Sequence, residues 1–113
     1  MEASGVMNLH ILHTALSHEG LRMYFSKPYG LELLLVLHSA EAAGADNGID
    51  DTFDTIRFNM PRRAAFSSFI QQLELNGHVL KRPSEFKASK SVLRLSDGVS
   101  IALKGFLGTN SFS

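Results

Sequence analysis

The stretch MPRRAAFSSFIQQLELNGHVLKR, residues 60–82, contains the clearest helical pattern of the chain. Its apolar side chains recur at the i, i+3, i+4 and i+7 positions of one helical face: Phe66, Phe69, Ile70 and Leu73. This spacing predicts a helix over residues 61–75, with Pro61 in its first turn, where a proline sacrifices no hydrogen bond. Asn76-Gly77 is expected to end the helix, with one of the two in the left-handed conformation.

A short β-hairpin is predicted directly after this helix. Residues 78–82 and 91–95 contain strand-forming residues, and the second run alternates between polar and apolar side chains. Residues 83–89 read as the loop that joins the two strands, because they contain a proline and two serines.

Two helical segments precede this unit. Residues 31–43 are apolar nearly all round, which fits a helix at the centre of a core. The run AGADNG, residues 43–48, is a loop by composition. A short helix follows it, in which Asp50 or Asp51 caps the N-terminus, because a carboxylate there accepts backbone N–H groups and complements the helix dipole.

Further helices are expected at both ends of the chain. Residues 6–17 form an amphipathic pattern that either ends at Gly20 or continues through Phe25. Ser96 is expected to cap a last helix that runs through Leu103. The length of 113 residues predicts a single domain. Its approximate core is expected over 21–104, with an extra N-terminal helix over 1–20 and a loose tail over 108–113.

This order of elements resembles a winged helix-turn-helix domain, and most closely the MarR type of bacterial transcriptional regulators. Two motifs carry the resemblance. Leu73-x-x-x-Gly77 leads into a strand that ends in Lys81-Arg82, and LRLSDGV, residues 93–99, is similar to the family's return from the wing into the next helix.

The resemblance implies a mainly α fold with a small β-hairpin wing, built as a three-helix core with additional N-terminal and C-terminal helices. It implies double-stranded DNA binding by a small bacterial transcriptional regulator, with a recognition helix over 61–75 in the major groove and a wing over 79–95 on phosphate or minor groove. The segment after the wing is too short for the family's two C-terminal dimerisation helices. A homodimer is therefore expected through the apolar face of residues 6–17.

Nine residues are the candidates for contact with DNA. Arginine pairs with guanine or phosphate, glutamine with adenine, and serine with either class of base edge. Basic side chains on a wing position the protein on phosphate without reading sequence. The candidates on the helix and the hairpin are Arg62, Arg63, Ser67, Ser68, Gln71, Lys81, Arg82, Lys87 and Lys90.

The charges are unevenly distributed although the formal net charge is zero. Residues 1–56 hold two basic and eight acidic side chains, and residues 57–94 hold eight basic and two acidic ones. The first segment therefore carries −6 and the second +6. This asymmetry favours a basic face directed at a polyanion, with a merely solvated face as the alternative.

Other classes of function are not favoured by the sequence. The chain has no cysteine, which excludes disulfides and thiol chemistry. His10, His13 and His18 are poorly spaced for zinc, and the acidic run 46–54 lacks the EF-hand spacing. No nucleophile elbow or phosphate-binding glycine loop is present, so neither an enzyme nor a cofactor is expected.

The longest aliphatic run, residues 33–37, is far too short to span a bilayer, and no signal peptide is recognisable, so a soluble, cytoplasmic protein is expected. Two alternatives to DNA binding stay open. One is a non-enzymatic winged-helix adaptor for protein contacts, and the other is a small-molecule sensor whose effector is unknown.

Overall fold

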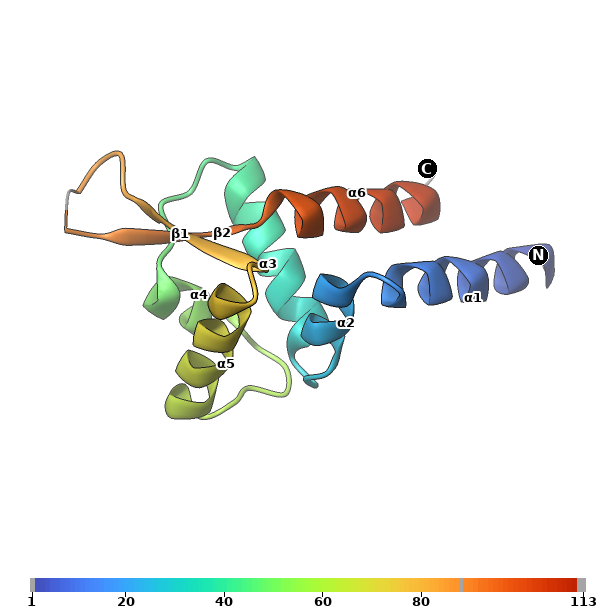
Figure 1. Ribbon diagram of the computed structural model, residues 1–113, viewed down its shortest axis with the longest axis horizontal. Helices are drawn as coiled ribbons and strands as arrows, with labels where there is room; N and C mark the ends of the chain where they lie inside the picture. Colours follow the sequence, from blue (N-terminus) through green and yellow to red (C-terminus); the bar gives the residue numbers. More distant parts are fainter. Residues whose placement is uncertain (1, 88, 112–113) are drawn as a thin grey trace.

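The computed structural model describes residues 2–87 and 89–111, which form a mainly helical fold with one small antiparallel sheet (Figure 1). This confirms the predicted class of a mainly α chain with a β-hairpin. The elements in chain order are α1 (Glu2–Leu16), α2 (Glu19–Phe25), α3 (Gly30–Ala42), α4 (Ile49–Thr55), α5 (Arg63–Leu75), β1 (Val79–Pro83), β2 (Ser91–Leu95) and α6 (Asp97–Ser111).

Helix α5 buries the four residues that its periodicity singles out, Phe66, Phe69, Ile70 and Leu73. Its start differs from the prediction, because Arg62 has an extended conformation and is the N-cap residue. Pro61 therefore lies before the helix and not in its first turn. The predicted end is confirmed: Gly77 has a φ of +76°, and the backbone N–H groups of Gly77 and His78 donate to Glu74 (3.0 Å) and Leu73 (2.8 Å).

The hairpin pairs Val79 with Leu95 and Pro83 with Ser91. The predicted first strand, 78–82, is displaced by one residue. His78 cannot join the ladder because its N–H closes the end of α5. The second strand has its predicted bounds.

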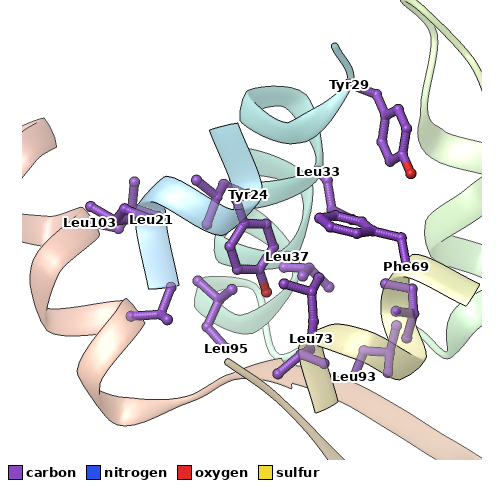
Figure 2. Packing of buried hydrophobic residues seen from close by; sticks show 14 of the residues in the cluster. Leu21, Tyr24, Tyr29, Leu33, Leu37, Phe69, Leu73, Leu93, Leu95 and Leu103 are labelled. Carbon is purple, nitrogen blue, oxygen red and sulfur yellow. The ribbon is translucent and has the colours of Figure 1, made fainter. Parts of the chain in front are cut away.

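The core lies where α2, α3, α5, the hairpin and α6 meet (Figure 2). Helix α3 is not buried all round, although its apolar pattern predicts this, because Leu31 and Leu35 are 46% and 37% exposed. Leu33 and Leu37 of α3 are fully buried in the core. Tyr24 of α2 lies beside them, and its hydroxyl donates to the carbonyl oxygen of His78 at 3.0 Å. This hydrogen bond joins α2 to the start of the hairpin and satisfies a polar group that burial would otherwise leave unpaired.

Helices α1 and α6 lie side by side and project away from the rest of the fold, so that both termini lie at one end of the molecule (Figure 1). Helix α1 ends at Leu16, within one residue of the predicted helix over 6–17, but it begins earlier, at Glu2. The break falls at Ser17-His18 and not at Gly20, and His18 starts α2 by accepting the Leu21 N–H on its Nδ1 at 3.3 Å. Gly20 lies within α2, where an added Cβ would meet Val99.

The predicted C-terminal end was also wrong. Helix α6 continues past Leu103 to Ser111, where a loose tail from residue 108 was expected; residues 112 and 113 lie outside the described part. Packing against α1 and α2 explains the longer helix, with the rings of Phe25 and Phe106 in edge contact at 6.4 Å. Helix α6 follows Ser96, whose carbonyl oxygen accepts the Ser100 N–H at 2.8 Å.

Candidate nucleic-acid interface

Most side chains on the outward face of α5 are polar, although Leu75 at its C-terminal end is 81% exposed. The candidates there are all exposed: Arg62, Arg63, Ser67, Ser68 and Gln71. They lie opposite the buried aromatic and aliphatic stripe, as the helical period requires. Ala64 and Ala65 are also exposed, so little side-chain bulk would keep a ligand away from the first turn of α5.

Arg63 is held by the neighbouring helix α4. Its guanidinium forms an ion pair with Asp50, and it lies 3.7 Å from a carboxylate oxygen of Asp54. It also lies over the ring of Phe53, 4.5 Å from the ring centroid. Of the two adjacent arginines, only Arg62 is without an ion pair to a carboxylate among the side chains that are described.

The candidate cations of the hairpin also differ in whether they form ion pairs with carboxylates. Lys90 lies 2.9 Å from Asp51 and 4.0 Å from Asp46, and Lys81 lies 3.5 Å from Glu74 of α5. Arg82 and Lys87 form no ion pair with any carboxylate in residues 9–87 and 89–108.

The structure does not bring all four hairpin cations to one surface. Successive residues of a strand point to opposite faces. Lys81 and Lys90 line a hollow of about 380 Å³ beside α4, whereas Arg82 lines a separate hollow of about 700 Å³ together with Phe86. Lys81 and Arg82 therefore serve different faces of the hairpin, although they are adjacent in the sequence.

The acidic and basic segments of the sequence meet in space. Asp46, Asp50, Asp51 and Asp54 belong to the −6 segment, and they contact Arg63 and Lys90 of the +6 segment. The asymmetry therefore does not give a uniformly basic face, because among the described side chains two of the eight cations of the +6 segment pair with carboxylates of the −6 segment at the surface. Sequence reasoning assigned the acidic run to a loop and a cap and missed these pairs.

The pair at the base of the hairpin alters the protonation of both partners. The hydrogen bond from Lys90 lowers the pKa of the Asp51 carboxyl, and the Gly48 N–H, at 3.2 Å, adds to the effect. The same hydrogen bond raises the pKa of Lys90. Since Asp51 binds its proton less readily in the folded chain, the pair stabilises the fold above the unfolded pKa of Asp51. This contribution is lost as the pH falls through the lowered folded value.

A serine organises the hairpin loop. The Oγ of Ser84 accepts the N–H groups of Phe86 (3.0 Å) and Lys87 (2.9 Å) and donates to a carboxylate oxygen of Asp46 at 2.8 Å. The loop is thereby tied to the segment before α4, with Phe86 and Lys87 exposed. No periodicity in the sequence indicated this link, which spans almost forty residues.

The other sequence candidates do not form a site. Within the described residues, no group of three or more histidine, aspartate or glutamate side chains is placed to hold a metal ion. No helix in that part of the chain is both long enough and apolar enough to cross a bilayer. Comparison of the chain with family models, curated proteins and solved structures gives no match.

Proposed function

We propose that this chain is a winged-helix DNA-binding domain, similar to MarR-type regulators, that acts on transcription in the bacterial cytoplasm. The observation that carries the proposal is the polar outer face of α5, where Arg62, Ser67, Ser68 and Gln71 are exposed along one side. The order α3, α4, α5, hairpin, α6 supports it, because this is the order that the fold requires.

In this proposal α5 enters the major groove, which is wide enough for one helix. Arg62 stands at the N-terminal end, which enters the groove first in such complexes, and Gln71 lies two turns further along. Lys87, exposed in a loop fixed by Ser84, contacts phosphate and sets the register of the helix. Base edges are then read by α5, and the hairpin contributes affinity that depends little on sequence.

Arg62→Ala tests the assignment directly. We expect it to weaken duplex binding by roughly 1–3 kcal/mol, measured by fluorescence anisotropy with labelled duplexes, and to relax preference at one base position. Arg22→Ala is the matched control, because it removes the same charge from an exposed arginine of α2, outside the candidate interface. Equal affinities for the two variants would contradict the placement of α5 in the groove.

The projecting pair of helices supports the expected homodimer. Leu9 and Leu12 of α1 are 53% and 38% exposed, and Ile101 of α6 is 71% exposed. The side chains of Val6 and Met7, which belong to the predicted apolar face, lie outside the described part. Two copies joined there would present two α5 helices to half-sites about one DNA turn apart.

Sedimentation equilibrium tests the dimer. We expect twice the mass of the chain at tens of micromolar, and a monomer for Leu9→Asp combined with Leu12→Asp, because burying two carboxylates in an apolar seam is unfavourable. A parent chain that sediments as a monomer, and whose association state does not change when residues 1–17 are deleted, would contradict this part of the proposal.

A protein adaptor is the second candidate, and one surface favours it. An open apolar groove of about 690 Å³ runs along the outer side of α3, between Leu31, Leu35 and Phe58. These three side chains are 46%, 37% and 73% exposed, so the groove is available for contact with another macromolecule.

A further inference from the structure

The contact between α4 and α5 places two carboxylates beside a cation of the candidate DNA-binding face. Asp50 and Asp54 lie one helical turn apart on α4, and both approach the guanidinium of Arg63, which begins α5. Resting on the DNA-binding function proposed above, we propose that Asp50 and Asp54 form an autoinhibitory contact with Arg63. They occupy its guanidinium at the protein surface and so lower the affinity for DNA of any sequence.

The geometry makes this occupation well defined. The ring of Phe53 forms a floor beneath the guanidinium, 4.5 Å from its centroid, and the two carboxylates hold the guanidinium at its edges. Asp50 stands in the first turn of α4, where a negative charge is favoured by the helix dipole. The arginine is therefore directed toward α4.

The ion pair is also exchangeable. The side chains of Arg63, Asp50 and Asp54 are 56%, 76% and 67% exposed, and solvent-exposed ion pairs contribute little to stability. A DNA phosphate can therefore compete for Arg63, but it replaces an existing partner and meets two nearby negative charges. Binding that depends on phosphate alone gains little from this arginine.

The effect falls on the affinity for every sequence. The sequence-independent part of DNA affinity comes from phosphate contacts, whereas base contacts by Arg62 and Gln71 are unaffected by the pairing of Arg63. A penalty that is equal for every duplex lowers specific and non-specific affinity alike and leaves their ratio unchanged. At a given protein concentration, only duplexes that also gain base contacts then remain bound.

A double-mutant cycle tests the proposal. Asp50→Asn with Asp54→Asn should raise the affinity for a random duplex about tenfold at low salt, because Arg63 becomes available and two negative charges are removed. The same two substitutions in an Arg63→Ala background change the charge identically but have no arginine to release. There the gain should fall to about threefold or less. Glu41→Gln on α3, outside this junction, should change affinity less than twofold.

The outcomes separate this proposal from the proposed function. If the parent chain binds duplex DNA and the gain is the same with and without Arg63, the role of the carboxylates is contradicted while DNA binding stands. If neither the parent nor the asparagine variant binds duplex DNA, the DNA-binding function fails and this proposal fails with it. Thermal melting checks that the variants fold, and Asp54→Asn alone, outside the first turn of α4, serves if the double variant does not.

Discussion

Phe69→Ala is expected to lower the free energy of unfolding by about 3–5 kcal/mol, because a fully packed aromatic side chain leaves a cavity that the surroundings fill only in part. Phe69 is 3% exposed, and its ring meets those of Tyr24 and Tyr29 edge-on at centroid distances of 6.3 and 5.8 Å. It therefore joins α5 to α2 and to the turn before α3. Urea denaturation followed by circular dichroism measures the change.

Phe58→Ala is the control, since it removes the same side chain from a position that is 73% exposed. Its expected cost is within about 0.5 kcal/mol. Equal destabilisation by the two substitutions would show that the buried face of α5 has been misassigned, and the polar face opposite it would lose its support.

Gly30→Ala is expected to cost about 3 kcal/mol, at the upper end of the usual penalty for overpacking. An added Cβ at Gly30 would overlap the carbonyl oxygen of Tyr24, which is backbone and cannot rotate away. The tight turn between α2 and α3 also depends on this approach, because the Gly30 N–H donates to the carbonyl oxygen of Lys27 at 2.9 Å. The melting temperature should fall accordingly.

Gly105→Ala in α6 gives the opposite expectation, since an added Cβ there meets nothing within 4 Å. In a helix interior this exchange stabilises by about 0.5–1 kcal/mol. A Gly30→Ala variant that melts with or above the parent chain would contradict the close packing of α2 on the start of α3.

The parts of the fold that sequence patterns predicted are those that depend on local periodicity. The apolar face of α5, the glycine at its C-terminal end and the return strand all follow from spacing within a few residues. The boundaries that were wrong depend on distant contacts. Helix α6 extends because it packs on α1. An added Cβ at Gly20 would meet Val99, so the glycine there reflects close packing and not a helix break.

In the candidate site too, some features follow from local sequence patterns and others depend on contacts between distant residues. Arg62 has an extended conformation and lies before the helix, whereas the exposure of Ser67 and Gln71 follows from helical periodicity alone. The occupation of Arg63 by Asp50 does not, because the two residues lie in different helices and only the fold brings them together. The opposed charges of the two sequence segments were the available signal, since they permit internal pairing as readily as attraction to a polyanion.

The salt dependence of duplex binding tests most sharply whether this chain binds DNA. Log affinity should fall linearly with log salt concentration, by roughly 0.9 for each phosphate neutralised. Lys87, which contacts phosphate from both copies of a dimer, then gives a slope of about −2 or steeper. A slope near zero, or no binding to duplex DNA at low salt, would contradict the DNA-binding function. It would favour the protein adaptor, with the apolar groove on α3 as its contact surface.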